Sequence, residues 1–296
     1  MSAPMKLSVP RVRLSESVAP FSGNVRGNAT SSAHRALFVM RVALSVVIMT
    51  LGSMGMLVVA MVTLFLARRF YAEVIGKCLG IGILRIWGVR YRVHGSPPPG
   101  QVVYISNHTS TIDIFLLIAL ALPRTRFFLS GFLRKFFPIA IVGYLIRIFW
   151  TVRQDFPERR RQIFQRADRI LRRTGDSVYL SPEGKRVTTG GIGLFNKGSF
   201  HLATSLGAPI VPLYLAIPDD TNPGMGYDAK PGTIDVWFLP AIPTSHWTVE
   251  DVEKNRDSVR GLYVRVHDAV RAGFAPSKMT ITHDTRGRRD AHDWRF

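Results

Sequence analysis

A long run without charged residues is the feature that most limits how this chain folds. Residues 42–67 contain no charged side chain, and arginines flank the run at Arg35, Arg41, Arg68 and Arg69. As a helix, the run would be about 39 Å long, whereas the hydrocarbon core of a bilayer is roughly 30 Å thick. The run therefore predicts a membrane segment. The polar leader before it is too long for a cleaved signal peptide.

The sequence leaves open how this segment meets the membrane. Because arginines stand on both sides, the bias of positive charge toward cytoplasmic loops gives no orientation. The sequence Gly-Ser-Met-Gly at residues 52–55 would also allow a break into two short helices that enter and leave the same leaflet. We therefore predict a disordered basic leader at 1–35. At 36–88 we predict a membrane helix or helical hairpin, followed by an amphipathic helix.

Beyond residue 88, short apolar runs alternate with helical patterns. Runs typical of strands occupy residues 89–93, 102–105, 176–180, 210–216 and 233–239, and helical patterns occupy residues 112–122, 157–173 and 197–206. Strands that alternate with helices predict an α/β fold with a mixed, mostly parallel sheet flanked by helices. This domain is expected to cover residues 89–275. The polar segment 276–296 is predicted to be a disordered tail.

The balance of charge indicates the kind of partner. A formal charge of +19 suggests an anionic partner, either nucleic acid or anionic lipid. The membrane segment, and the lack of a helix-turn-helix, zinc-finger or aromatic RNA-binding signature, favour lipid, so no nucleic-acid partner is expected. Residues 127–138 mix phenylalanines with basic residues as interfacial segments do, although a core helix whose cations snorkel to the surface fits the same pattern. The single cysteine, Cys78, excludes an internal disulfide framework.

Two residues that suit a catalytic base lie where the second predicted strand gives way to a helix. His108 follows the strand, and Asp113 stands at the start of the helix. Five residues of regular helix rotate by about 140°, so the two side chains meet only if His108 lies in the turn. A carboxylate bound to one ring nitrogen would leave the other nitrogen to accept a proton. The alternative is a capping cluster, in which Asn107 or Thr109 caps the helix and His108 fills the corner.

A second polar cluster, at residues 181–186, follows the predicted strand at 176–180. Gly184 permits a sharp turn, Arg186 offers a planar fork for a phosphate or carboxylate, and Lys185 adds a point charge. Open α/β sheets bind their ligands at the carboxyl ends of strands, so this turn predicts an anion site. A solvated charged turn is the alternative.

Taken together, these segments resemble the lysophosphatidate acyltransferase family, part of the glycerolipid acyltransferase superfamily. Residues 107–113 match its first motif, an Asn-His pair and an Asp five residues after the His. Residues 182–186 resemble its Pro-Glu-Gly-Thr-Arg motif, and residues 195–200 and 208–212 are similar to its Phe-Lys-Lys-Gly and Pro-Ile-Val-Pro segments. The order of the motifs is that of the family.

The resemblance implies a role for each matching residue. His108 is the general base that deprotonates the acceptor hydroxyl, and Asp113 orients it. Glu183, Gly184 and Arg186 help bind the glycerol phosphate. The hydroxyl attacks an acyl thioester directly, without an acyl-enzyme, a metal or a cofactor.

Two positions depart from the family pattern. Lys185 stands where the family has threonine, and an extra cation there suits a different or more highly charged head group. The second motif is only partly present, because Arg147 stands where the family has glycine. Arg153, which closes that motif, is a candidate phosphate ligand. A solvated arginine at a strand end is its alternative.

The resemblance thus implies that residues 89–275 form an acyltransferase domain of phospholipid synthesis. It would move a fatty acyl group from acyl-CoA or acyl carrier protein to the sn-2 hydroxyl of 1-acylglycerol 3-phosphate. Because these donors are cytosolic, we expect the domain on the cytoplasmic face of the inner or plasma membrane. Another lysolipid, such as a lyso-ornithine lipid, is an alternative acceptor. A non-catalytic, membrane-anchored anion-binding protein is the alternative of another class.

Overall fold

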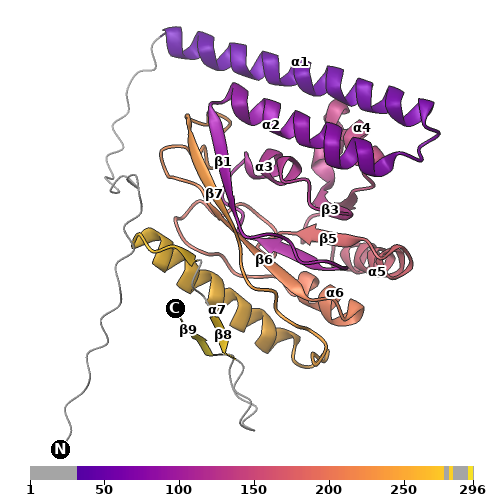
Figure 1. Ribbon diagram of the computed structural model, residues 1–296, viewed down its shortest axis with the longest axis vertical. Helices are drawn as coiled ribbons and strands as arrows, with labels where there is room; N and C mark the ends of the chain where they lie inside the picture. The colour runs from indigo at the N-terminus through magenta and orange to yellow at the C-terminus, as the bar shows by residue number, and fades with distance from the viewer. Residues whose placement is uncertain (1–31, 277–279, 283–292, 296) are drawn as a thin grey trace, which may run out of the picture.

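The computed structural model describes residues 32–276, 280–282 and 293–295. Within them, a seven-stranded sheet has the order β1-β7-β6-β2-β5-β3-β4 (Figure 1). The strands are β1 (Val89–His94), β2 (Val103–Ser106), β3 (Thr125–Ser130), β4 (Phe149–Thr151), β5 (Ser177–Leu180), β6 (Ile210–Ala216) and β7 (Gly232–Phe238). All neighbouring pairs are parallel except β6 and β7. The predicted mixed, mostly parallel sheet is confirmed.

The direction of β7 follows from its connection. Parallel neighbours need a crossover that returns the chain to the same edge of the sheet, and this crossover is usually a helix. Residues 217–231, which join β6 to β7, contain no helix, so the chain turns back and β7 runs antiparallel to β6. Strand β1 pairs parallel with β7. These two strands therefore oppose the direction of the rest.

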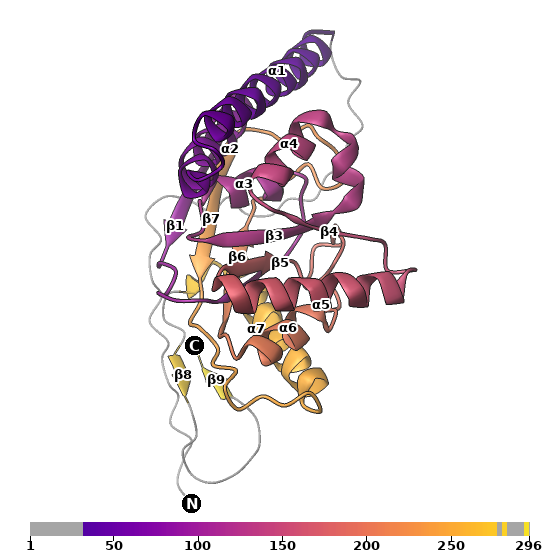
Figure 2. The same ribbon diagram turned by 90° about the vertical axis from the view of Figure 1, so that its right-hand side faces the viewer.

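Helices cover both faces of the sheet (Figures 1 and 2). One face carries α5 (Pro157–Thr174), α6 (Gly198–Leu206) and α7 (Val252–Arg271), and the other carries α2 (Gly76–Ile86), α3 (Asp113–Ala119) and α4 (Phe137–Leu145). Gly175 and Gly207 end α5 and α6 in the left-handed conformation, with φ of 63° and 62°. Glycine adopts this conformation without a steric penalty, which is why the helix ends were predictable.

The centre of the sheet positions the two motifs found in the sequence, at residues 107–113 and 182–186. Every residue of β2 and β5 is buried, as expected for strands covered on both faces. The two strands are parallel neighbours. Their carboxyl ends therefore lie at the same edge, and the chain leaves β2 toward His108 and leaves β5 toward Glu183.

The predicted membrane segment lies largely in one continuous helix, α1 (Ser32–Val62). This helix begins within the predicted leader, whose residues 1–31 lie outside the described part of the chain. The helix passes unbroken through residues 52–55, so the predicted alternative of a break at this point is wrong. Gly52 faces Leu79 of α2, and a Cβ atom on Gly52 would overlap the Leu79 side chain. The small residue serves the close packing of two helices rather than a break.

Helix α1 pairs with the segment that follows it as a hairpin (Figure 1). The chain reverses at residues 63–67, where Leu64 and Phe65 have positive φ. A π-helical segment, η1 (Phe70–Ile75), then leads into α2, so the amphipathic helix predicted at this place is regular only in its second part.

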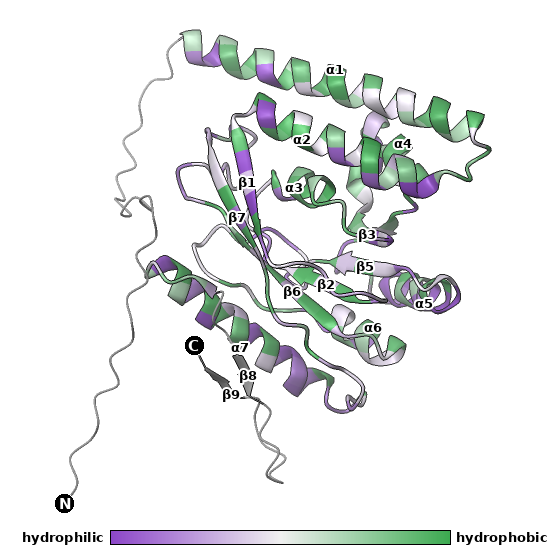
Figure 3. Ribbon diagram, in the orientation of Figure 1, coloured by the Kyte–Doolittle hydropathy of each residue, from purple (hydrophilic) through white to green (hydrophobic). Residues whose placement is uncertain are grey.

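Most of α1 faces away from the rest of the protein. Helix α1 is long and apolar enough to cross a membrane, and only 11% of its most apolar window is buried. Figure 3 shows apolar residues along nearly its whole length. The described part of the chain thus contains one candidate membrane helix.

The aromatic and basic segment at 127–138 divides into two parts. Phe127 and Phe128 are buried in β3, so this part belongs to the core, but as a strand rather than as the helix of the alternative. Phe132, Phe136 and Phe137 are exposed on a 3-10 turn, η2 (Gly131–Lys135), and at the start of α4. Their contact with lipid stays a prediction.

Part of the predicted tail is ordered as two short strands. Strand β8 (Thr280–Thr282) pairs antiparallel with β9 (Asp293–Arg295), so the prediction of disorder is wrong for these residues. Both segments contain β-branched or aromatic residues, which favour strands. The remaining residues after 276 lie outside the described part of the chain.

Candidate active site

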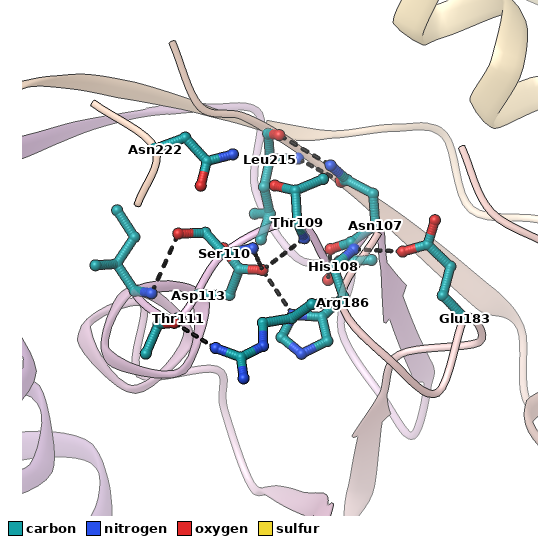
Figure 4. Close-up of polar contacts among 12 residues, drawn as sticks. Asn107, His108, Thr109, Ser110, Thr111, Asp113, Glu183, Arg186, Leu215 and Asn222 are labelled. Atoms are coloured by element: carbon teal, nitrogen blue, oxygen red, sulfur yellow. Dashed lines mark hydrogen bonds and ion pairs between the residues drawn. The ribbon is translucent and has the colours of Figure 1, made fainter. Parts of the chain in front are cut away.

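His108 and Asp113 meet at the corner between β2 and α3, as their spacing predicts (Figure 4). Asp113 is the first residue of α3 and is 1% exposed. Its Oδ2 atom lies 2.7 Å from Nδ1 of His108 and accepts hydrogen bonds from the backbone N–H groups of Thr109 and Ser110 at 3.0 and 3.1 Å. Three donors on one buried oxygen fix the whole turn around the imidazole.

This arrangement assigns the two ring nitrogens of His108. An ionised carboxylate only accepts hydrogen bonds, so Nδ1 carries the proton that Asp113 binds. The neutral imidazole then has its lone pair on Nε2. The His108 side chain is 31% exposed while that of Asp113 is 2% exposed. The corner therefore presents a proton acceptor to incoming molecules and hides the group that orients it.

The turn after β5 holds the His108 backbone from both sides. Oε2 of Glu183 accepts a hydrogen bond from the His108 N–H at 2.6 Å, and the Val187 N–H donates to the His108 carbonyl at 2.7 Å. The other carboxylate oxygen, Oε1, accepts from the Gly193 N–H at 2.8 Å. Both oxygens of Glu183 therefore face backbone donors, which makes it a positioning residue for His108. Its predicted contact with the acceptor stays a prediction.

Burial and hydrogen bonding have opposite effects on the pKa of Glu183. Burial raises the pKa of its carboxyl, and the two backbone hydrogen bonds lower it, with a net rise above the usual value. Burial disfavours the charged form, whereas donors to the carboxylate favour it. At 2% exposure, the two N–H partners thus offset part of the effect of burial on the carboxyl.

Arg186 shares the site with His108. Its Nη1 donates to Oγ1 of Thr111, and the Thr111 hydroxyl donates to the Gly226 carbonyl at 2.6 Å. Figure 4 shows the Arg186 side chain reaching across the turn that carries His108. The structure therefore brings the predicted base and the predicted anion ligand to one edge of the sheet.

Gly184 and Lys185 lie in the exposed part of the same turn. Gly184 has a φ of 67°, and a Cβ atom there would lie 2.7 Å from Nδ2 of Asn196. That Asn196 nitrogen donates to the carbonyls of Pro182 and Glu183. Glycine is needed both for its conformation and for this close approach.

Arg153 lies further out on the same edge of the sheet. It follows the carboxyl end of β4, its side chain is 83% exposed, and its Nη2 lies 2.9 Å from Asp155. The structure does not join it to His108 or Arg186, so its role as a phosphate ligand stays a prediction. Arg147, where the resemblance implies glycine, has a φ of 59°. This left-handed conformation explains why glycine is favoured there.

The sequence did not reveal the hydrogen-bond partner of the Asn107 side chain. Its side chain pairs with the backbone of Leu215 in β6, accepting from N–H at 2.8 Å and donating to the carbonyl at 3.0 Å. The alternative in which Asn107 caps the helix is therefore wrong. Since Leu215 is 108 residues away, no spacing signal could have found this contact.

Two further residues support the site from α7. The Tyr263 hydroxyl donates to the carbonyls of Ile105 and Leu213, and so ties β2 to β6. Arg260 donates to the carbonyls of Gly193 and its neighbour Ile192, and Gly193 in turn binds Glu183. The sequence around Tyr263 and Arg260 indicates a helix but gives no sign of these contacts.

The comparisons with known proteins agree with this geometry. Residues 90–216 match the family model described as Acyltransferase. The matched region extends from β1 to β6 and includes both His108 and Arg186. This part of the chain is therefore similar to the acyltransferase family. The described residues include no group of three or more His, Cys, Asp or Glu that could hold a metal ion.

Several named relatives align with half or more of this chain. A 1-acyl-sn-glycerol-3-phosphate acyltransferase of Limnanthes douglasii is 27% identical over 228 residues, which are 76% of this chain and 80% of that protein. The human 1-acyl-sn-glycerol-3-phosphate acyltransferase beta is 31% identical over 151 residues, 51% of this chain and 54% of its own.

A solved structure shares the fold. The 1-acyl-sn-glycerophosphate acyltransferase PlsC of Thermotoga maritima aligns with a TM-score of 0.58 over 79% of this chain and 99% of that chain. Its sequence identity is 20%, so this likeness supports the α/β architecture alone.

Proposed function

We propose that this acyltransferase moves a fatty acyl group from acyl-CoA or acyl carrier protein to the sn-2 hydroxyl of 1-acylglycerol 3-phosphate, giving phosphatidate. The observation that carries the proposal is the His108 imidazole, which binds Asp113 through Nδ1 and presents Nε2 in the turn that Arg186 reaches. The names of the relatives support the choice of acceptor.

The mechanism is a direct transfer. Nε2 of His108 takes the proton of the acceptor hydroxyl while the hydroxyl oxygen attacks the thioester carbonyl carbon. The carbon–sulfur bond then breaks, the sulfur leaves as a thiolate, and the imidazolium returns the proton to it. Asp113 holds the imidazole in the correct tautomer and stabilises its positive charge. These steps need no acyl-enzyme, metal or cofactor.

The acceptor phosphate is bound by the turn after β5. The planar guanidinium of Arg186 suits two phosphate oxygens, and Lys185 adds a positive charge from the exposed side. The exposed backbone at Gly184 allows close approach of the ligand. Arg153 extends the cationic surface along the same edge. The Glu183 carboxylate acts indirectly, through the backbone of His108.

The location of the enzyme follows from its substrates. The apolar α1 is embedded in the inner or plasma membrane, where the lysolipid acceptor is found. The catalytic domain lies on the cytoplasmic face, because acyl-CoA and acyl carrier protein are cytosolic.

An acyl-transfer assay tests the proposal. The purified full-length chain would be incubated with acyl-CoA or acyl carrier protein and with 1-acylglycerol 3-phosphate, a lyso-ornithine lipid or lysophosphatidylcholine, and products read by mass spectrometry. His108→Ala should abolish turnover, whereas His201→Ala, an exposed histidine on α6, should leave it unchanged. Arg186→Ala should chiefly raise the KM for the acceptor.

Three results would count against the proposal. Acyl transfer by His108→Ala would remove the mechanism. An unchanged acceptor KM in Arg186→Ala would remove its phosphate contact. A faster reaction with the lyso-ornithine lipid would change the acceptor but keep the reaction class.

A further inference from the structure

A cavity of about 310 Å³ lies at the edge of the sheet opposite to His108. It is enclosed by the α1–α2 hairpin turn, the end of α3, part of α4 and the amino ends of β3 and β5. Its apolar wall includes Phe70, Ile118, Leu122, Val142 and Ile146. The length of β5 separates it from the turn that carries Arg186. It is therefore distinct from the site of acyl transfer.

The polar wall of this cavity carries an excess of positive charge around one carboxylate. Asp176 is 7% exposed and lies 2.7 Å from Arg126, 3.4 Å from Arg68 and 3.9 Å from Arg124. Arg126 is itself buried and makes the closest contact, so it balances the charge of Asp176. Arg68 and Arg124, which both line the cavity, are then in excess.

Two further arginines increase this excess. Arg69 lines the cavity, and Arg147 lies near enough to Arg68 to lower its pKa, after burial and Arg126. The other acid of the lining, Glu73, accepts a hydrogen bond from the backbone N–H of Arg124 at 2.9 Å. Three arginines thus contact Asp176, while Arg69 and Arg147 add further positive charge at the cavity and beside Arg68. Clustered cations favour a bound anion.

Irregular backbone gathers around the same cavity. Phe70 and Glu73 belong to the π-helical segment η1, a rare conformation that is found frequently at functional sites. Ala121 and Arg124 both have a φ of 47°, a left-handed conformation that is unfavourable for residues other than glycine. Such conformations persist where the surrounding structure enforces them, often at ligand sites.

We propose that this cavity binds the phosphate-bearing head group of an anionic membrane lipid. Arg68, Arg69 and Arg124 would hold the phosphate oxygens, and the apolar wall would receive the upper part of the acyl chains. The position fits such an occupant, because the hairpin turn beside the cavity exposes Leu66 and Phe70, at 85% and 51%. A lipid bound here would join the membrane hairpin to the catalytic domain.

Lipid binding to the full-length chain in non-ionic detergent tests this site. An Arg186→Ala background would remove the contribution of the acyl-transfer site. Short-chain phosphatidylglycerol, short-chain phosphatidylcholine and inorganic phosphate would be added separately. Bound molecules would be counted by native mass spectrometry, and affinities measured by calorimetry. We expect one phosphatidylglycerol to bind, at least tenfold more tightly than either of the other two.

Charge-neutral variants locate the binding. Arg69→Gln and Arg124→Gln should each weaken phosphatidylglycerol binding about tenfold, the effect of losing one charged hydrogen bond. Arg124→Lys should keep most of it. The matched control Arg169→Gln, at an exposed position of α5, should leave the affinity for phosphatidylglycerol unchanged. Equal effects of Arg69→Gln and Arg169→Gln, in variants that melt like the parent, would overturn the site. Equally tight binding of inorganic phosphate would overturn the choice of a lipid.

Discussion

Replacing Glu183 by glutamine would separate positioning of the catalytic base from binding of the acceptor. The wild-type carboxylate accepts one hydrogen bond from the His108 N–H and one from the Gly193 N–H. Glutamine has nearly the same shape, but only its carbonyl oxygen accepts. Its NH₂ group would face the N–H of either His108 or Gly193. That N–H would lose its acceptor, and two donor groups would point at each other.

The size of the effect follows from these two contacts. A hydrogen bond to a charged group contributes about 1.5–3 kcal/mol to stability. Glu183→Gln removes one such bond and neutralises the acceptor of the other, so we expect the free energy of unfolding to fall by about 2–4 kcal/mol. The His108 turn would also shift. A displacement of about 1 Å at a reacting group lowers the rate roughly 100-fold.

Steady-state kinetics and thermal unfolding would measure both effects. We expect kcat to fall about 100-fold while the acceptor KM changes less than about threefold, since Glu183 does not contact the phosphate in this scheme. Glu250→Gln, an exposed site before α7, is the matched control and should change neither quantity. A large rise in the acceptor KM with kcat unchanged would refute the positioning role and restore Glu183 as a direct acceptor ligand.

Three further predictions concern the scaffold. Burial raises the pKa of Asp176, but the hydrogen bond and charge of Arg126 outweigh burial, so the pKa lies below its usual value. The ionised carboxylate therefore stabilises the fold, and this contribution is lost as pH falls through the folded-state pKa. Asp176→Asn should therefore lower the free energy of unfolding by about 3–5 kcal/mol near pH 7. The difference in melting temperature from the wild type should shrink below about pH 4. Gly184→Ala should lower the free energy of unfolding by at least about 1–2 kcal/mol and also lower kcat, because Gly184 has a positive φ and a Cβ atom there would overlap Asn196. An unchanged melting temperature would contradict this expectation. Tyr263→Phe leaves two buried strand carbonyls without their donor, so urea unfolding should show a loss of about 1–3 kcal/mol, and a neutral effect would show that water replaces the hydroxyl.

Secondary structure was predictable wherever a local signal marked an element. Strand β6 occupies the predicted residues 210–216, and α5 and α6 end within one residue of the predicted ends at 173 and 206. Errors arose where a local signal had two meanings. The glycines at 52–55 permit either a break or close helix packing, and the approach of Leu79 decided for packing.

The candidate site was predictable only in part. His108 and Asp113 are five residues apart, so the turn between a strand and a helix suffices to bring them together. The contacts of Glu183 with His108 and of Asn107 with Leu215 cross 75 and 108 residues. They exist because β2 lies between β5 and β6 in the sheet.

The sequence by itself determined the α/β class, the apolar helix before the domain, and the chemical groups available for acyl transfer, because periodicity, glycines and short motifs act through the local backbone. Only the tertiary structure decided that Glu183 positions the base, that β7 runs antiparallel to β6, and that three arginines gather around Asp176 at the opposite edge. Local patterns report which face of an element is buried, but not which elements become neighbours. That choice depends on how the whole core packs.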